Sequence, residues 1–314
     1  MIHIINFFPS LDHDISIQKP ELGKIGTVFN YTVKAGGKGL NVACLLSFLK
    51  VPNHLWVVLG DLKDPGTIFF NQFLKKNSIN ATVFNHTGIL RSNFSIQLNS
   101  KSLGKFNQES ASMDPKMLSK IESVALSEMK SGDWVVLNGR LPRENARTYY
   151  HWIQKLHLKK IKVFLDSSGL ALKYACDAGP DFLKINRFEL SEILKGKIHS
   201  LDQVKKLHGW FLTHHIVSGA ITEGPQGALL WENHKMIRVA FEKRIQYSHT
   251  LGAGDAFLAG YLFGLYRKWN LNQRIRYATT MATKVARNGI DGFFKNKKLK
   301  IENSIHIKLC HPQN

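Results

Sequence analysis

Residues 35–59 read AGGKGLNVACLLSFLKVPNHLWVVL, and this stretch carries the pattern that decides the fold. Apolar side chains recur at helical spacing over 40–49, and the compact apolar run 54–59 is typical of a buried strand. We expect further strands at 2–7, 134–137, 162–165 and 181–185, and further helices at 67–76, 144–157, 187–194, 253–269 and 271–287. Buried strands that alternate with helices predict βαβ units and a mostly parallel sheet.

Two stretches interrupt this alternation. Residues 13–34 and 88–108 alternate apolar and polar positions with no helix between them, as in RSNFSIQL over 91–98. This pattern is typical of a half-exposed antiparallel sheet. Such a sheet could close as a lid over a cleft or serve as a dimer surface. We find no internal repeat and no flexible linker, so we expect one domain over residues 1–314 with the lid inserted in it.

The composition excludes several classes of protein. The chain has 314 residues, of which 44% are hydrophobic and 21% charged, so collagen-like, low-complexity and disordered chains are excluded. No apolar run approaches the ~18 residues that span a bilayer, and the N-terminus MIHIINFFPSLDHD lacks a basic leader. Cys44, Cys176 and Cys310 form no CxxC pair, which argues against a cysteine zinc site. We expect a cytoplasmic protein with no membrane partner.

The net charge is unusual. Lys and Arg number 43 against 23 Asp and Glu, a formal charge of +20. An excess of this size attracts anions, such as nucleic acids or phosphorylated metabolites. Because the sequence has no zinc-finger spacing, RNP-like aromatic strand or heptad zipper, a nucleic-acid partner is not expected.

The segment TLGAGDAF, residues 250–257, is the most informative for chemistry. Small residues at 252–254 allow a tight turn that gathers backbone N–H groups at the start of a helix, where anions bind. A carboxylate at Asp255 could cap this helix, or it could act as a base beside the anion site. The spacing alone leaves both interpretations open.

A second glycine-rich segment, GGKG at 36–39, opens the helix over 40–49. It is not a Walker A motif, because Gly39 rather than Ser or Thr follows Lys38, and neither segment fits GxGxxG. Taken alone, these glycines suit a tight turn as well as a ligand loop.

Together, GGKGLNVA (36–43) and TLGAGDAFLAG (250–260) resemble the paired signatures of the ribokinase-like carbohydrate kinases, the PfkB family. FPSLD (8–12), LDSSGLAL (165–172), LKINRFEL (183–190) and TEGPQGAL (222–229) extend the resemblance, which is closest to the branch of 1-phosphofructokinase, tagatose-6-phosphate kinase and the minor 6-phosphofructokinase. The resemblance implies an α/β fold, a ribokinase-like three-layer αβα sandwich with a mostly parallel central sheet and a small antiparallel β lid.

The resemblance also implies roles for individual residues. Asp255 would be the general base, and the amides of Gly252, Ala253 and Gly254 would hold the transferred phosphoryl group. The residues implied in binding the sugar are Asp12, Gly37, Lys38 and Asn41, and those implied in binding its phosphate are Lys24, Arg91 and Asn93. Arg140 stands where the family has a small serine near the cleft, and it could add a phosphate contact or narrow the sugar pocket.

The nucleotide would be held by Lys184, Asn186, Thr222, Gly224, Gly227 and Asn288. Asn186 and Glu189 would order Mg²⁺ through water, although without the resemblance the same pair is a helix capping box. The implied cofactors are thus ATP and Mg²⁺, and a K⁺ ion could use the carbonyl of His249. Four positions depart from the family pattern, namely Lys50, Arg140, Ile185 and His249.

The implied function is ATP-dependent phosphorylation of a sugar phosphate, with fructose 1-phosphate as the expected acceptor. Tagatose 6-phosphate, fructose 6-phosphate and an unphosphorylated sugar are the alternatives within the fold. A metabolite sensor or nucleic-acid-binding protein on a kinase fold is the alternative of a different class. Two copies of the chain could also pair through the lid as a homodimer.

Overall fold

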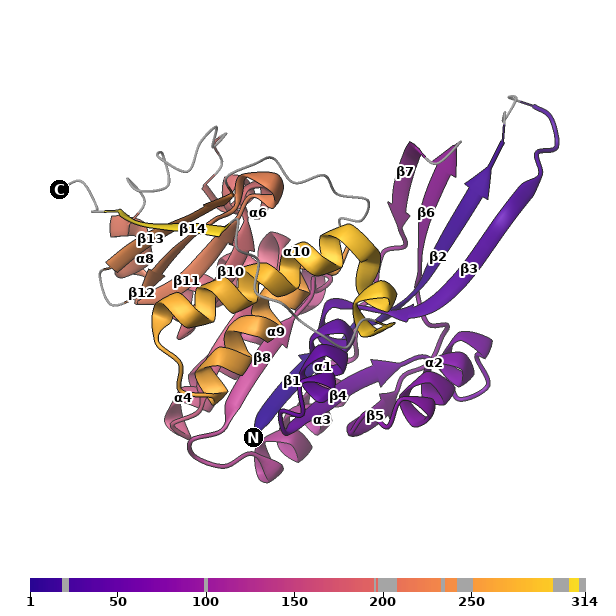
Figure 1. Cartoon of the computed structure of the whole chain (residues 1–314). Helices are drawn as coiled ribbons and strands as arrows, with labels where there is room; N and C mark the ends of the chain where they lie inside the picture. The colour runs from indigo at the N-terminus through magenta and orange to yellow at the C-terminus, as the bar shows by residue number, and fades with distance from the viewer. Residues whose placement is uncertain are drawn as a thin grey trace.

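The computed structural model describes residues 1–18, 23–98, 101–194, 196, 208–232, 235–241, 251–295 and 305–310. These residues form one large sheet of ten strands and one small sheet of four (Figure 1). The order in the large sheet is β14 (Ile305–Cys310), β13 (Lys235–Phe241), β12 (Ala228–Glu232), β11 (Ser218–Thr222), β10 (Phe182–Asn186), β9 (Lys162–Asp166), β8 (Trp134–Asn138), β1 (Ile2–Asn6), β4 (Asn53–Leu59) and β5 (Ala81–Asn85). All pairs from β11 to β5 are parallel, whereas β12, β13 and β14 add an antiparallel edge.

Helices cover both faces of the large sheet, and each layer has its own hydrophobic core. Side chains of α1 (Lys38–Phe48), α2 (Pro65–Lys76), α9 (Ala253–Tyr266) and α10 (Leu271–Lys295) pack in the core on one face. Those of α3 (Pro115–Glu128), α4 (Thr148–Leu158), α5 (Gly169–Asp177), α6 (Arg187–Leu194) and α8 (His208–Thr213) pack in the core on the other. Successive strand residues, such as Ile4 and Ile5, serve opposite cores because side chains alternate across a strand. The expected three-layer αβα sandwich is confirmed.

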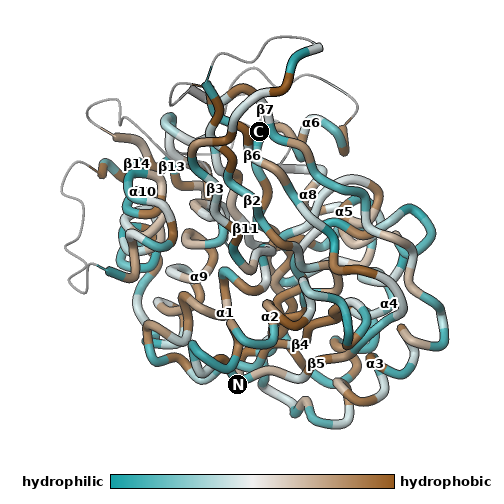
Figure 2. The backbone as a smooth tube through the Cα atoms, turned by 90° about the vertical axis from the view of Figure 1, so that its right-hand side faces the viewer, coloured by the Kyte–Doolittle hydropathy of each residue, from teal (hydrophilic) through white to brown (hydrophobic). Residues whose placement is uncertain are grey.

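Hydropathy follows these layers. Figure 2 shows hydrophobic segments in the strands of the large sheet, for example at β4, and hydrophilic turns toward the outside. All seven residues of β4 except His54 are buried, as expected for a strand covered on both faces. Within the described part of the chain, no helix is both long and apolar enough to cross a membrane.

The small sheet projects from one end of the large sheet (Figure 1). Its order is β3 (Val28–Gly36), β2 (Ser10–Ile17), β6 (Ser92–Leu98) and β7 (Lys101–Asn107). The two outer pairs are antiparallel as expected, but the central pair β2–β6 runs parallel. The reason is topological: β2 and β6 both leave the large sheet in the same direction, after β1 and after β5 respectively.

Some boundaries differ from the expected ones. The helix expected over 144–157 is a short 3₁₀ turn, η1 (Arg143–Asn145), followed by α4 from Thr148. The Asn145 side chain binds both backbone groups of Met113, at 2.8 and 3.0 Å, and so ties this turn to the segment that precedes α3. Helix α10 continues past Arg287 to Lys295 with a kink at Gly289, whose φ is 69°. The antiparallel edge β12–β14 was not anticipated.

Candidate active site

The site lies where the direction of strand addition reverses. From β1 the chain builds outward through β4 and β5 with α1 and α2 on one face, and from β8 it builds through β9 to β11 with α4, α5 and α6 on the other. In open α/β sheets, ligands bind at such switch points, outside the carboxyl ends of the strands. Three adjacent strands end there in polar residues, Asn6, Asn138 and Asp166. Helices α1 and α9 begin beside them.

The two glycine-rich segments supply the N-termini of these helices. Gly37 precedes α1, and Gly252, with φ of 79°, precedes α9, where only a glycine takes this turn without strain. Neither helix has a side-chain cap at this position. Asn41 in the first turn of α1 contacts Asp255 in the first turn of α9, so the two helix N-termini lie close together and their dipoles favour an anion there.

Asp255 lies in the first turn of α9 and is 5% exposed. Its carboxylate is bound from the other glycine-rich segment, because Asn41 Nδ2 donates to Asp255 Oδ2 at 2.8 Å. Burial raises the pKa of Asp255 to about 6, and the nearby Asp166 carboxylate adds to this rise, while Lys184, Lys38 and the Asn41 hydrogen bond oppose it. Asp255 is thus a carboxylate that can gain and lose a proton near neutral pH.

Beside Asp255 lies a buried charge cluster that the sequence analysis missed. Asp166, at the end of β9, is fully buried and accepts from Lys38 Nζ and Lys184 Nζ, each at 2.8 Å. Lys38 also lies 3.3 Å from Glu189 Oε1. Burial disfavours each charge, but the two ammonium groups lower the pKa of Asp166, and the carboxylates of Asp166, Glu189 and Asp255 raise the pKa of Lys38. Lys38 is therefore held charged next to Asp255.

A signal for Asp166 was present in the sequence. It ends an apolar run in LDSSGLAL, and a carboxylate at the carboxyl end of a parallel strand lies at the ligand-binding edge. The structure places Lys38 with this cluster, whereas the resemblance implied a contact to sugar hydroxyls.

The base of the lid gathers the other expected acceptor-binding residues. Asn93 donates to Asp12 Oδ1 at 2.9 Å, and Ser10 donates to the same oxygen at 2.9 Å. Arg91 Nη1 lies 3.4 Å from Asn93 Oδ1, and its Nε donates to the carbonyls of Phe8 and Pro9 at 3.3 and 3.2 Å. Burial lowers the pKa of Arg91, although Asp12 opposes the change. The R-x-N pair and Asp12 thus form one cluster.

Gly36 is a further residue that the sequence analysis did not single out for this cluster. A Cβ atom at this position would lie 2.2 Å from Asp12 Oδ2, so no larger residue fits without moving the carboxylate. The absence of a side chain at Gly36 therefore lets Asp12 take its place at the base of the lid.

Two expected phosphate-binding residues lie outside this cluster. Lys24 is exposed in the connection between β2 and β3, and Arg140 is exposed beside Gly169 on the β8–η1 connection. The structure does not bring either into contact with Asp12, Arg91 or Asn93 in the hydrogen bonds of the described residues.

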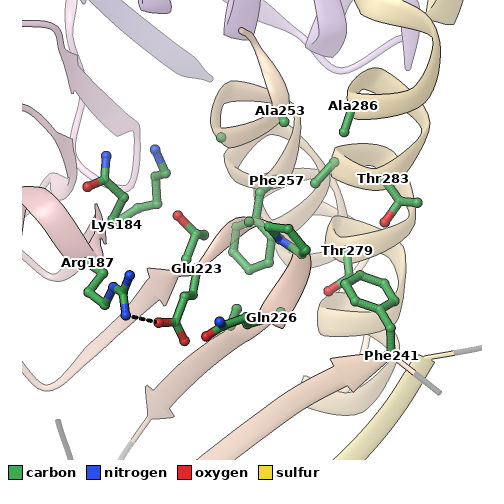
Figure 3. A pocket seen from close by; sticks show the side chains of 18 of the residues that line it. Lys184, Arg187, Glu223, Gln226, Phe241, Ala253, Phe257, Thr279, Thr283 and Ala286 are labelled. Carbon is green, nitrogen blue, oxygen red and sulfur yellow. Dashed lines mark ion pairs between the residues drawn. The ribbon is translucent and has the colours of Figure 1, made fainter. Parts of the chain in front are cut away.

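Beside the start of α9, a cavity of about 910 Å³ opens between β10–β11 and the helices α9 and α10 (Figure 3). It is lined by the expected nucleotide residues Lys184, Asn186, Thr222, Gly224 and Gly227. Ala253 and Gly254 border its polar end, while Phe257, Ala282 and Ala286 form an apolar wall. A cavity of this size, apolar on one side and cationic at one end, suits a nucleotide.

Asn186 and Glu189 form the capping box at the start of α6. Glu189 N donates to Asn186 Oδ1 at 2.9 Å, and Asn186 N donates to Glu189 Oε2 at 2.8 Å. Each of these oxygens has a second lone pair, so both can also accept from metal-bound water. The cap and the expected role near Mg²⁺ are therefore compatible.

Two further expectations concern Asn288 and His249. Asn288 is exposed on α10, donates to the Lys284 carbonyl at 3.2 Å and does not line the cavity. His249, the expected K⁺ ligand, lies outside the described residues.

Comparison with known proteins identifies the family of the chain. The model of the pfkB family of carbohydrate kinases matches residues 8–292. The chain is 22% identical over 293 residues to a 1-phosphofructokinase of Borreliella burgdorferi, covering 92% of each chain. It is 26% identical over 292 residues to the 1-phosphofructokinase of Bacillus subtilis, covering 91% of this chain and 92% of the relative.

Solved structures show the same fold. The phosphofructokinase-2 of Escherichia coli in complex with substrates and products superposes with a TM-score of 0.83 at 21% identity, covering 94% of this chain and 98% of the other. The same enzyme in complex with potassium has a TM-score of 0.83 at 20% identity, covering 94% and 97%.

Proposed function

Because this chain belongs to the pfkB family of carbohydrate kinases, we propose that it transfers the γ-phosphoryl group of ATP to a hydroxyl of a sugar phosphate, with fructose 1-phosphate as the acceptor. One observation carries the proposal. Asp255, a buried carboxylate with a pKa of about 6, directly follows Gly254, which lines the nucleotide-sized cavity, and is hydrogen-bonded to Asn41 on α1, the helix that begins next to Gly36 and Asp12.

The proposed reaction needs a base and a site for the transferred group. Asp255 takes the proton of the acceptor hydroxyl while the oxygen of that hydroxyl forms a bond to the γ-phosphorus. The bond from the γ-phosphorus to the β,γ-bridging oxygen breaks, and ADP is released. The N–H groups at the start of α9 and the ammonium group of Lys184 stabilise the charge on the phosphoryl oxygens. Asn41 orients the carboxylate of Asp255 toward the acceptor.

The implied cofactors fit the residues at the site. Lys184, Gly254 and the start of α9 suit the phosphates, and the apolar wall of the cavity suits a base. When bound, Mg²⁺ neutralises the phosphates of ATP, and Asn186 with Glu189 would hold its waters. We also propose that a K⁺ ion binds to the backbone carbonyl of His249.

The acceptor phosphate is assigned to the lid base. Arg91 presents a guanidinium group, which suits a phosphate, within a cluster that already holds Asp12 and Asn93. The names of the curated relatives support a phosphorylated hexose as the acceptor. Tagatose 6-phosphate and fructose 6-phosphate fit the same chemistry, and Lys24 and Arg140 would join the site only if the lid closes over it.

The Arg91→Ala variant tests the acceptor assignment. We expect the KM for fructose 1-phosphate to rise at least ~10-fold, with little change in the KM for ATP, since one charge-assisted hydrogen bond is worth about 1.5–3 kcal/mol. An equal effect on turnover of unphosphorylated fructose would assign Arg91 to the fold rather than to the phosphate. An enzyme for uncharged sugars would then be the better description.

We also propose that the enzyme works in the cytoplasm as a homodimer joined through the lid. One face of the small sheet carries His13, whose ring stacks on those of Tyr31 and Phe94. Tyr31 is 55% exposed and Phe94 is 36% exposed. Phe106, opposite Phe94 on β7, is 58% exposed. Such an aromatic face suits a second copy of the sheet. Light scattering of Phe94→Asp against wild type tests this, and an unchanged mass would contradict it.

A further inference from the structure

Glu223 is a buried acid in a cavity that otherwise suits an anion. It follows β11 directly, and its side chain is 4% exposed although it borders the cavity. Arg187, from the first turn of α6, lies 2.8 Å from Glu223 Oε1. Gln226, with its amide nitrogen turned toward the acid, donates to the two carboxylate oxygens at 2.9 and 3.0 Å. Two side chains, those of Arg187 and Gln226, therefore hold this carboxylate in one orientation (Figure 3).

The position of Glu223 in the cavity limits what it can contact. The phosphate end is defined by Lys184 and Gly254, and the apolar wall by Phe257 and Ala282. In Figure 3 the Arg187–Glu223 pair lies opposite Phe257 and Thr279. A carboxylate repels phosphate and gains nothing from the faces of the base, so the parts of a nucleotide that suit it are the hydrogen-bond donors, namely the ribose hydroxyls and the exocyclic amine of the base.

The carboxylate still has capacity to accept such a donor. An ionised carboxylate offers about four lone-pair sites. Arg187 uses one on Oε1, and Gln226 reaches one on each oxygen, which leaves a site on Oε2. Arg187 also neutralises the acid, so the cavity as a whole stays favourable for phosphate. A neutralised, fixed carboxylate with one open acceptor site is suited to a ribose hydroxyl, as acids beside other nucleotide sites are.

We propose that Glu223, oriented by Arg187 and Gln226, binds a ribose hydroxyl of the nucleotide and makes this kinase selective for ribonucleotides over deoxyribonucleotides. This inference rests on the proposed function, because it takes ATP as the phosphoryl donor. Glu223 is a specificity-determining residue, remote from the transferred phosphoryl group, so its effect falls on nucleotide binding.

The test compares ATP, 2′-deoxy-ATP and 3′-deoxy-ATP, each by calorimetric binding and by kcat/KM with saturating acceptor. Wild type should prefer ATP about 10- to 100-fold over the analogue that lacks the bound hydroxyl, the range expected for a hydrogen bond to a charged group. Glu223→Gln should reduce this preference to within ~3-fold, chiefly by weakening ATP binding. The double variant Arg187→Gln with Glu223→Gln, which removes both charges of this pair, should show the same loss of preference.

Glu232→Gln is the matched control, because Glu232 also pairs with a buried arginine, Arg274 at 2.9 Å, but does not line the cavity. It should keep the wild-type preference. Equal binding of ATP and both analogues by wild type would overturn the inference, as would an unchanged preference in Glu223→Gln and in the double variant. If wild type binds no nucleotide, the proposed function itself is wrong, and the calorimetry distinguishes that outcome from loss of selectivity alone.

Discussion

Asn41 on α1 donates its side-chain amide to Oδ2 of Asp255 on α9 at 2.8 Å, although the two residues lie 214 positions apart in the chain. The hydrogen bond joins the two glycine-rich segments into one site. It also explains why both segments must be present for the proposed chemistry: one supplies the base and the other orients it.

The Asp255→Asn substitution removes the proposed base and keeps a side chain of nearly the same size and shape. We expect kcat to fall by ~10²-fold or more, since general-base catalysis contributes about this much. Binding of MgATP, measured by calorimetry, should change little, because the cavity lining and the start of α9 stay in place. Turnover at the wild-type rate would contradict the assignment of Asp255 as base.

The pH profile should report the same group. Because the pKa of Asp255 is raised to about 6, kcat/KM for the acceptor should fall as the pH drops below about 6, where the carboxylate is protonated and cannot take a proton. Lys38 opposes this rise in pKa. Lys38→Met should therefore move the acid limb to higher pH. A limb that stays in place, or moves to lower pH, would show that another group controls the profile.

Asp166→Asn should reveal the cost of an unpaired buried charge. The Lys184 side chain is 5% exposed and Asp166 is fully buried, so the variant leaves a buried ammonium group beside a neutral amide. Removing one partner of such a pair costs about 3–5 kcal/mol in free energy of unfolding. Denaturant titration measures this loss, with Glu122→Gln as the control. Glu122 pairs with the half-exposed Lys155, and this pair should be worth less than ~1 kcal/mol. Equal effects of the two substitutions would contradict the account of the charge cluster.

Gly36→Ala tests the close contact at the base of the lid. The new Cβ would meet Asp12 Oδ2 at 2.2 Å, so the carboxylate must move away from Ser10 and Asn93. We expect the KM for the acceptor to rise about 10-fold, equivalent to 1.4 kcal/mol. Gly26→Ala is the control, since its Cβ would have no atom within 4 Å, and it should leave the KM unchanged. Equal KM values for the two variants would contradict the assignment of Asp12 to the acceptor site.

Much of the fold could be predicted from the sequence, because its signals are local. Buried runs such as that of β4 and the glycine turns before α1 and α9 depend on neighbours in the chain, and the structure has them where expected. The parallel pairing of β2 with β6 depends instead on how two distant strands leave the large sheet. Alternation of apolar and polar residues does not encode strand direction.

In the candidate site, too, residues within a motif could be predicted, whereas contacts between distant segments could not. The motif residues Asn41 and Asp255 were expected at one centre, and the structure places them in contact. The charge cluster around Asp166 arises from the register between β9 and β10 and from the reach of a lysine on another helix, which no single segment contains. Glu223 escaped notice for a related reason, because its partner Arg187 is on a different segment.

The measurement that tests the central claim most directly is ADP release from MgATP by the wild-type protein with a panel of acceptors: fructose 1-phosphate, fructose 6-phosphate, tagatose 6-phosphate, fructose, ribose and adenosine. We predict the highest kcat/KM for fructose 1-phosphate, exceeding that for fructose by ~10²-fold or more, since losing the contacts to one phosphate costs about 3 kcal/mol or more. Turnover restricted to an uncharged acceptor would contradict the phosphate site, and no turnover of any acceptor by protein that binds ATP would contradict the kinase activity itself.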